Sequence, residues 1–337
     1  MKTRFQFFLF LATTLLATAC GRDFGKGKSD DKEPPRPPFE EPFGAERIRI
    51  HGNYAVVTSQ AGFSVFDISV PTDPRRIATV RSGFANDSVV VGNRLFVANW
   101  GEGLLAFDVS DWSNPKKVLQ LPVAGVASAV RLQGTKLYVG GNLAGLSIVD
   151  IASPDAPVVL GGIDTEGQME DLAVQGNYVF APVTFEGLLV YDVSDPRNPV
   201  KVGVGRSGFP ESSMSWRIDL HGDTAVVTDT FGGLELFDIS NPTLPKSITR
   251  LGPRLRDVAV IGDLAVASQG PEIIIHDISK RGTISVVSRL TLMNKETDHV
   301  LGIEIRGNLA YVCASTQLVV VDIADPRNPI VVSRTVM

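Results

Sequence analysis

Residues 188–199 read LLVYDVSDPRNP, an apolar run that ends in an aspartate, with a proline seven positions after it. Runs of β-branched and aromatic residues bounded by Asp, Asn and Pro are typical of strands that end in turns. Pro199 fixes φ and stops the strand from continuing, while Asp192 can accept hydrogen bonds from turn amides. The segment therefore predicts a strand followed by a tight turn.

The same pattern recurs in six further segments, and successive final aspartates lie 39 to 46 residues apart. These segments are FSVFD (63–67), LLAFD (104–108), LSIVD (146–150), LELFD (234–238), IIIHD (273–277) and LVVVD (318–322). A glycine keeps the same period, at Gly52, Gly92, Gly134, Gly176, Gly222, Gly262 and Gly307. A period near 42 is typical of propeller blades, and residues 44–337 divide into seven units of that length. We interpret the seven aspartates as turn caps rather than as a chemical array.

The fourth unit shows how each unit divides into four strands. The expected strands are Glu170–Gln175, Tyr178–Val183, Leu188–Val193 and Val200–Gly205, with turn residues between them. The repeats contain no 3.6-residue periodicity long enough for a helix. The sequence therefore predicts an all-β fold, a seven-bladed β-propeller of four-stranded antiparallel blades over residues 44–337.

The ends of the repeat region predict how the ring closes. The seventh unit ends with its own fourth strand, Ile330–Val336, and the first begins with its own innermost strand, Arg47–Ile50. We therefore expect closure by packing between blades rather than by a shared strand. The alternative is an extra outer strand at Phe39–Phe43, which Pro42 disfavours.

The first 43 residues resemble a leader and a tether. Residues 1–19 have a short basic start and an apolar core typical of a signal peptide. The sequence LATAC (16–20) resembles a bacterial lipobox, which implies lipidation of Cys20; ordinary cleavage near Ala19 is the alternative. Residues 20–43 hold no Val, Ile, Leu or Met and five prolines, a composition that predicts a disordered tether. Because Gly21 is not an acidic retention signal, we expect an exported lipoprotein, in the outer membrane of a diderm bacterium or on the cell surface.

The repeated motifs resemble the LVIVD-repeat family of exported bacterial proteins, and LSIVD and LVVVD come closest to its pattern. The resemblance covers residues 44–337. The sixth unit diverges most, because Lys280, Arg281 and Gly282 replace the proline turn. The resemblance implies a propeller and an exported location, and it supplies no reaction and no catalytic residues.

Composition and motifs argue against several classes of function. The net charge of −5 disfavours nucleic-acid binding, which needs a basic surface. Two cysteines exclude a disulfide framework, and four scattered histidines disfavour a zinc enzyme. No nucleophile elbow, metalloprotease helix, Cys-x-x-Cys pair or phosphate loop is present, and Cys313 is expected to be a buried, inert thiol. We therefore expect no catalytic residue, no metal and no cofactor.

Charged residues interrupt the innermost strands, which line the central channel of a propeller. Five positions before the turn glycine stand Arg47, Asp87, Asp171, Arg217 and Asp257. Two positions later the charged residues are Arg49, Arg131, Asp219 and Glu304, and closure of the ring would bring Glu304 to Arg49. Partly buried charges favour partners of opposite sign. Two interpretations stay open: an ion-paired channel mouth that keeps the blades in register, or a site for a small polar ligand or cation.

The longest loops follow fourth strands, at Arg206–Ser215 and Thr291–His299; Phe209 lies in the first of them and Trp216 follows it. Such side chains suit a binding surface and equally suit caps over the apolar ring. We predict one binding face with these residues: Phe84, Asp87, Asp171, Phe209, Trp216, Arg217, Asp257 and His299.

The leading hypothesis for function is a non-catalytic binding or scaffold module. It would be held to the membrane by its N-terminal lipid and present a face to an envelope or surface protein or glycan, with no nucleic-acid partner. The alternatives are a lactonase-like or quinone-dependent propeller enzyme, or a protein that binds a small ligand or ion at the channel mouth. The fold cannot separate them, because propellers support many activities.

Overall fold

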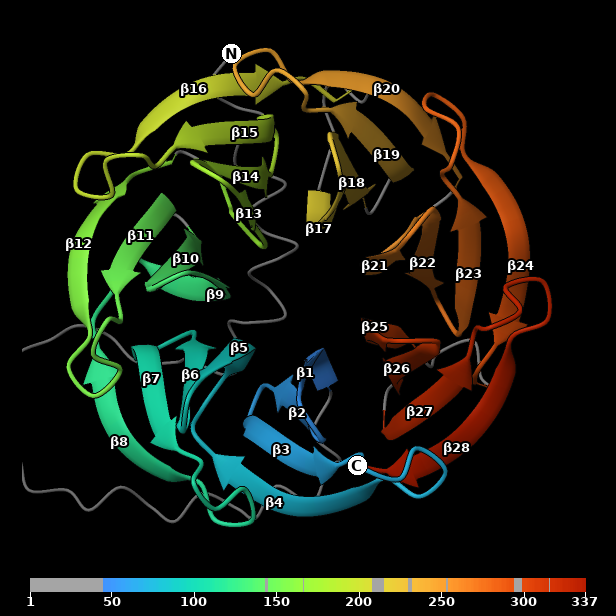
Figure 1. Cartoon of the computed structure of the whole chain (residues 1–337), viewed down its shortest axis with the longest axis horizontal. Coiled ribbons are helices and arrows are strands. Elements are labelled where there is room, and N and C mark those ends of the chain that lie inside the picture. The colour runs from blue at the N-terminus through green and yellow to red at the C-terminus, as the bar shows by residue number, and fades with distance from the viewer. Residues whose placement is uncertain are drawn as a thin grey trace, which may run out of the picture. The chain divides into compact units, whose positions relative to one another are not determined.

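The computed structural model describes residues 45–142, 145–165, 167–207, 215–229, 232–252, 254–293, 299–314 and 316–337. These residues form seven four-stranded antiparallel sheets arranged as blades around a central axis (Figure 1). The predicted seven-bladed propeller is therefore confirmed. The expected signal peptide, the tether with Cys20, the alternative strand Phe39–Phe43 and Phe209 lie outside the described residues.

Each of the first four blades is one uninterrupted segment of the chain. Blade 1 contains β1 (Ala45–His51), β2 (Tyr54–Ser59), β3 (Gly62–Asp67) and β4 (Arg75–Arg81). Blade 2 contains β5 (Ala85–Val91), β6 (Arg94–Asn99), β7 (Gly103–Asp108) and β8 (Lys116–Leu121). Blade 3 contains β9 (Val126–Gln133), β10 (Lys136–Asn142), β11 (Gly145–Asp150) and β12 (Val158–Ile163). Blade 4 contains β13 (Ala173–Gln175), β14 (Tyr178–Val183), β15 (Gly187–Asp192) and β16 (Val200–Gly205).

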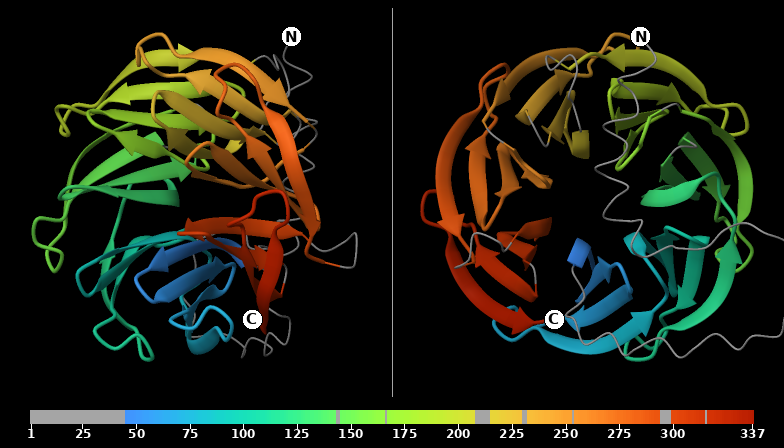
Figure 2. Two further views of the ribbon diagram at one scale, coloured as in Figure 1. Left: turned by 45° about the vertical axis from the view of Figure 1, so that its right-hand side comes forward. Right: turned by 180° about the vertical axis from the view of Figure 1, so that it is seen from behind.

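The last three blades follow the same plan. Blade 5 contains β17 (Ser215–His221), β18 (Thr224–Asp229), β19 (Gly233–Asp238) and β20 (Lys246–Leu251). Blade 6 contains β21 (Val258–Ile261), β22 (Leu264–Gln269), β23 (Glu272–Asp277) and β24 (Ser285–Thr291). Blade 7 contains β25 (Val300–Arg306), β26 (Leu309–Ala314), β27 (Gln317–Asp322) and β28 (Ile330–Val336). In each blade the first strand lies nearest the axis and the fourth lies outermost, as both faces of the ring show (Figures 1 and 2).

The apolar core lies between neighbouring blades. Second and third strands are buried almost throughout, whereas the fourth strands are largely exposed or half-buried. Between blades 1 and 2, Phe63 packs edge-on against Phe107, with 5.0 Å between the ring centroids. Because both faces of a blade contact a neighbour, its third strand is a continuous apolar run rather than an alternating one.

The repeated glycines and aspartates build one face of the ring, which we call the turn face. All seven turn glycines have φ between 51° and 61°, and the next residue does not, which is the pattern of a type II′ hairpin turn. Each of the seven aspartates accepts a hydrogen bond of 2.8–3.0 Å from the backbone N–H two residues later. The interpretation of the aspartates as turn caps is confirmed.

The divergent sixth unit folds like the others. In the segment that replaces the proline turn, the Thr283 N–H donates to the Lys280 carbonyl at 2.9 Å, and Gly282 takes φ 85°. Ile284 stands where the other units have proline and is buried. A different sequence therefore produces an equivalent turn.

The opposite face, which we call the loop face, contains the loops between second and third strands and those between blades. The two kinds of loop bond to each other; the Trp100 N–H, for example, donates to the Phe84 carbonyl at 2.8 Å. In the described residues there is no helix long and apolar enough to cross a bilayer.

The ring closes without a shared strand, as predicted, because β1–β4 and β25–β28 form separate sheets. Side chains join these two blades: Ser333 Oγ donates to the Pro71 carbonyl at 2.7 Å, and Thr335 Oγ1 donates to the Pro74 carbonyl at 3.1 Å. Two details were not anticipated. β13 begins at Ala173 rather than Glu170, and all seven blades have a register shift between the third and fourth strands.

Candidate functional site in the central channel

A layer of buried charges crosses the channel at the positions five residues before the turn glycines. We call it the deep ring: Arg47, Asp87, Asp171, Arg217 and Asp257. Arg47 Nη1 lies 2.7 Å from Asp87 Oδ2 and 3.1 Å from Asp171 Oδ1. Arg217 Nε lies 3.8 Å from Asp257 Oδ1. The sequence-based expectation that Arg47 pairs with Asp87 is confirmed, and Arg47 also reaches across the channel to blade 4.

A second layer, nearer the turn face, contains Arg49, Arg131, Asp219 and Glu304, and we call it the outer ring. Arg49 Nη1 lies 2.8 Å from Glu304 Oε2, so the predicted contact between the first and seventh units is confirmed. Arg49 Nε also contacts Asp87 Oδ1 at 2.9 Å, and Arg131 forms ion pairs with both Asp87 and Asp171. Six residues of the two rings therefore form one connected ionic network: Arg47, Arg49, Arg131, Asp87, Asp171 and Glu304.

Burial and neighbouring charge set the ionisation of these groups. Burial disfavours the charged form of Asp87, but Arg47, Arg49 and Arg131 outweigh burial and hold the pKa of Asp87 well below its usual range. For the same reasons, with Arg131 and Arg47 as the strongest cations, the pKa of Asp171 is lowered. Burial, together with repulsion from Arg47, lowers the pKa of Arg217 to about 10. The network therefore keeps Asp87 and Asp171 ionised.

The deep-ring carboxylates also connect the backbones of adjacent blades, a role that sequence reasoning missed. Each accepts the N–H of the residue that follows it and a second N–H from the innermost strand of the next blade. The second donors are Val130 for Asp87 (3.2 Å), Ile218 for Asp171 (3.4 Å) and Ile303 for Asp257 (2.7 Å). The signal in the sequence is that aspartate takes this position in units two, four and six.

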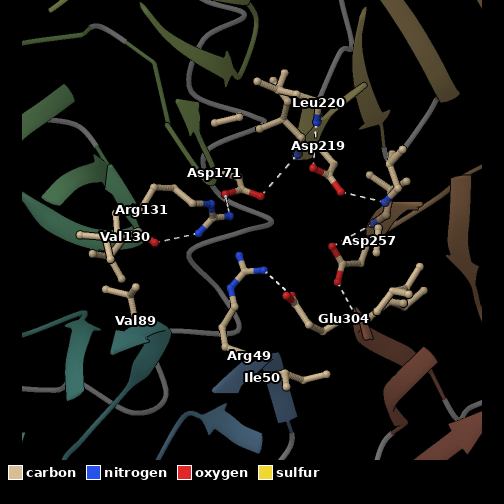
Figure 3. A pocket seen from close by; sticks show the side chains of 18 of the residues that line it. Arg49, Ile50, Val89, Val130, Arg131, Asp171, Asp219, Leu220, Asp257 and Glu304 are labelled. Atoms are coloured by element: carbon tan, nitrogen blue, oxygen red, sulfur yellow. Dashed lines mark hydrogen bonds and ion pairs between the residues drawn. The ribbon is translucent and has the colours of Figure 1, made fainter. Parts of the chain in front are cut away.

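A cavity of about 450 Å³ lies in the channel on the turn-face side of the deep ring (Figure 3). Its lining comes from the half of each innermost strand that runs into the glycine turn, and includes Arg49, Arg131, Asp219, Asp257 and Glu304. Figure 3 shows Arg131 entering from one side, and Asp219, Asp257 and Glu304 from the other. The cavity lining therefore carries charges of both signs, with Arg131 beside Asp171 on one side and Arg49 beside Glu304 on the other.

Asp219 differs from the other channel carboxylates. Its Oδ1 accepts the Leu220 N–H at 2.8 Å and its Oδ2 accepts the Val260 N–H at 2.7 Å. Within the described residues, no arginine, lysine or histidine forms an ion pair with it. Burial raises the pKa of Asp219, and repulsion from Glu304 raises it further.

The structure divides the eight candidate residues into different environments. Asp87, Asp171, Arg217 and Asp257 are between 0% and 7% exposed, so they lie inside the channel and do not belong to an exposed face. Phe84 is half-buried and stacks on Trp100, with 5.6 Å between ring centroids, and His299 is exposed before β25. The backbone of Trp216 lies in β17, its side chain is not described, and Phe209 falls outside the described residues. The eight candidates are therefore not brought together as one exposed surface.

Sequence reasoning missed two aromatic residues on the loop face. Trp100 is 37% exposed, and Phe185 is 70% exposed at the tip of the β14–β15 loop. Phe185 takes φ 67°, the left-handed region that a bulky residue rarely adopts. The sequence did contain a signal for both residues: each is an aromatic residue in a loop between a second and a third strand, and the repeat pattern of glycines and aspartates does not call for an aromatic residue there.

Two further reactive side chains, Cys313 and His51, are largely shielded from solvent. Cys313 is fully buried, as predicted, and burial raises the pKa of its thiol. His51, immediately before the turn glycine Gly52, is half-buried: it stacks on Trp112 with 6.4 Å between ring centroids, and burial lowers its pKa to about 4. No group of three or more His, Cys, Asp or Glu side chains in the described ranges is placed to hold a metal ion.

Comparison with known proteins matches the repeats to a family. The family model described as the LVIVD repeat matches residues 44–81, 82–121, 124–165, 166–204, 213–250 and 299–336. The interval between the last two matches, residues 251–298, contains all four strands of the divergent sixth blade. None of the curated proteins compared with the chain matches it.

Several solved structures share the fold. The computationally designed Ika8 protein aligns over 82% of this chain and 95% of its own, at 10% identity and a TM-score of 0.59. The β-propeller domain of Cps50 (Swd1) from Myceliophteria thermophila aligns over 80% and 93%, at 15% identity and a TM-score of 0.60. Sqt1 from Saccharomyces cerevisiae aligns over 87% and 86%, at 10% identity and a TM-score of 0.65. At these identities the likeness shows the fold alone.

Proposed function

The chain belongs to the LVIVD-repeat family, and we propose that it is a non-catalytic binding module of the cell envelope. In this proposal the propeller presents its loop face to an envelope or surface protein or glycan. The N-terminal segment holds the propeller to the membrane through a lipid on Cys20.

The observation that carries the proposal is the set of loop-face aromatics. Phe84 and Trp100 form a stacked pair between two loops, and Phe185 stands exposed in blade 4. Aromatic side chains supply much of the energy at interfaces, and a left-handed conformation costs a bulky residue about 1–2 kcal/mol. Phe185 therefore combines backbone strain with an exposed ring, and nothing in the blade architecture requires either.

The other surfaces have structural explanations of their own. The turn face is built from the seven glycine turns and seven aspartate caps, and the deep ring is occupied by its own ion pairs. The loop face is the part of the described surface where residues depart from the repeat. This contrast supports the loop face as the place where a macromolecular partner binds.

The envelope location rests on the sequence. An apolar leader ends in LATAC at Cys20, and the segment 20–43 has the composition of a flexible coil whose ends lie ~25–30 Å apart. A tether of this reach would let the loop face contact partners near the membrane surface. Several acyl chains would anchor the protein firmly, since each buried methylene contributes about 0.8 kcal/mol.

The binding test uses the full-length tagged protein expressed in its own cell and crosslinked before extraction. The combined variant Trp100→Ala with Phe185→Gly should lose the partner captured by the wild-type protein. The matched control is Leu244→Ala, which removes an exposed apolar side chain from the turn face, where Leu244 is 61% exposed. Equal capture by the wild-type and loop-face variants would contradict the proposal.

The anchoring test is separate. Cys20→Ser should leave the precursor unprocessed at this site or release the protein in soluble form. A Cys20→Ser protein that is cleaved normally and stays on the membrane would contradict lipidation at Cys20.

A further inference from the structure

The channel charges do not balance around the cavity. The two rings contain four arginines and five carboxylates, all on described residues: Arg47, Arg49, Arg131 and Arg217, with Asp87, Asp171, Asp219, Asp257 and Glu304. His51 also lines the cavity, and burial lowers its pKa to about 4, so it adds no charge at neutral pH. Four arginines and five carboxylates therefore leave one negative charge without a cation.

The excess charge is localised. Asp87 and Asp171 contact arginines of blades 1 and 3, Asp257 faces Arg217, and Glu304 contacts Arg49. Asp219 alone among these carboxylates has only backbone N–H partners within the described ranges. Each of its oxygens uses one acceptor position and keeps another for a ligand. Asp219 and Glu304 line the same cavity and repel each other, so a cation placed between them would stabilise both.

The wall opposite Asp219 and Glu304 contains Arg131 and Asp171 (Figure 3). Arg131 reaches into the cavity from blade 3 and uses Nη1 and Nη2 for its ion pairs with Asp87 and Asp171. None of its hydrogen bonds to described residues uses Nε, so that donor is available to a carboxylate. Ile50, Val260 and Ile305 also line the cavity and add apolar surface. The cavity thus offers unused acceptor positions on Asp219, an unused donor on Arg131 and apolar surface.

We infer that this cavity binds a small aliphatic amino acid or a closely similar zwitterion. The ammonium group lies between Asp219 and Glu304, the carboxylate faces Arg131, and the hydrocarbon stem contacts the apolar lining (Figure 3). A cavity of about 450 Å³ falls within the range of small-molecule sites, roughly 300–1,000 Å³.

This site is distinct from the proposed loop-face function. It lies on the turn-face side of the deep ring, and it uses outer-ring residues that the loop-face proposal does not involve. The failure of one proposal therefore leaves the other standing.

The first experiment compares ligands on the purified full-length protein by calorimetric titration. The probes are alanine, valine and leucine, with isoamylamine and 4-methylpentanoate as leucine analogues that lack the carboxylate and the ammonium group, respectively. We expect at least one amino acid to bind, with isoamylamine at least tenfold weaker and 4-methylpentanoate undetectable. Absence of binding by all three amino acids at millimolar concentration would overturn the inference. Equal binding of isoamylamine and leucine, or binding of 4-methylpentanoate alone, would overturn the zwitterion assignment.

The second experiment places the ligand in the cavity. Asp219→Asn should weaken amino-acid binding at least tenfold. Asp223→Asn is the matched control, because Asp223 is exposed in the glycine turn of the same blade, outside the cavity lining. Glu304→Gln provides a second variant in case Asp219→Asn does not fold, and it should weaken binding to a similar extent. A folded Asp219→Asn or Glu304→Gln protein that binds like the wild type would overturn the placement.

Discussion

Asp87→Asn removes one negative charge from a fully buried side chain without changing its size. In the folded protein Asp87 contacts Arg47 Nη1 at 2.7 Å, Arg49 Nε at 2.9 Å and Arg131, and its side chain is 0% exposed. It also accepts the backbone N–H groups of Ser88 and Val130. The substitution therefore acts on ion pairs that join blade 2 to blades 1 and 3, and on the hydrogen bond from the backbone of blade 3.

The expected loss in the free energy of unfolding is about 3–5 kcal/mol, the usual cost of removing one partner from a buried ion pair. The three arginines keep other carboxylates, since Arg47 and Arg131 retain Asp171 and Arg49 retains Glu304. The asparagine amide also places N–H donors where a carboxylate oxygen accepted from them. These effects oppose each other, and we expect the loss to stay within that range.

Urea denaturation at neutral pH measures this loss, because urea is uncharged and does not screen ion pairs. The matched control is Asp108→Asn, the same substitution at a half-buried turn cap that accepts the Ser110 N–H and pairs with Arg94 at 3.0 Å near the surface. Asparagine can keep that hydrogen bond, so the control should change stability far less. The slope of the free energy against urea concentration should be unchanged in both variants.

The pH dependence supplies an independent test. The pKa of Asp87 is lowered in the folded state, so its stabilisation is present above the unfolded pKa, about 3.9, and is lost as pH falls through the folded pKa. Asp87→Asn should therefore lose less stability than the wild type on acidification below about pH 4. A loss at neutral pH no larger than that of the control, with wild-type acid sensitivity, would refute this account of the deep ring.

Three further predictions follow from local geometry. Gly62→Ala should destabilise the protein far more than Gly52→Ala, as measured by urea denaturation. A Cβ on Gly62 would lie 1.9 Å from the Val80 carbonyl oxygen, whereas a Cβ on Gly52 meets nothing within 4 Å. Gly52→Ala should therefore cost only the left-handed backbone strain, about 1–2 kcal/mol. Phe185→Gly should raise the free energy of unfolding by about 1 kcal/mol by relieving the left-handed backbone, and an unchanged or lower value would contradict the strain. Cys313 should resist thiol reagents in the native protein and react on unfolding, since it is buried and its thiol pKa is raised; rapid labelling of the native protein would count against this.

The number and limits of the blades could be predicted because each repeated residue corresponds to one local backbone geometry. A turn glycine marks a positive φ and a repeated aspartate marks a capped turn, so both can be located without knowing what lies nearby in space. The contact between Glu304 and Arg49 could also be predicted, because the two residues hold equivalent positions in their units and equivalent positions of neighbouring blades lie side by side.

The candidate site was harder to predict because it depends on how far side chains reach across the channel. Sequence spacing places Arg47 beside Asp87 but does not show that Arg47 also reaches Asp171. It does not show that Asp87 and Asp171 are buried rather than exposed with Phe84 and His299. Nor can it foresee that Trp112 packs on His51, since that contact joins two blades through an irregular turn. Solvent exposure in a ring is set by neighbouring blades, which a single unit does not contain.

Because the first and last blades share no strand, the point at which the chain starts in the ring can be changed. Every blade is continuous in sequence, and no strand passes from the last blade into the first. A circular permutant that joins Met337 to Ala45 through a linker, and opens the chain between two other blades, would keep every strand beside its present partners. In a propeller whose closing blade combines strands from both ends of the chain, the pairing in that blade depends on where the chain begins and ends. The architecture of this ring therefore has no obligatory first blade.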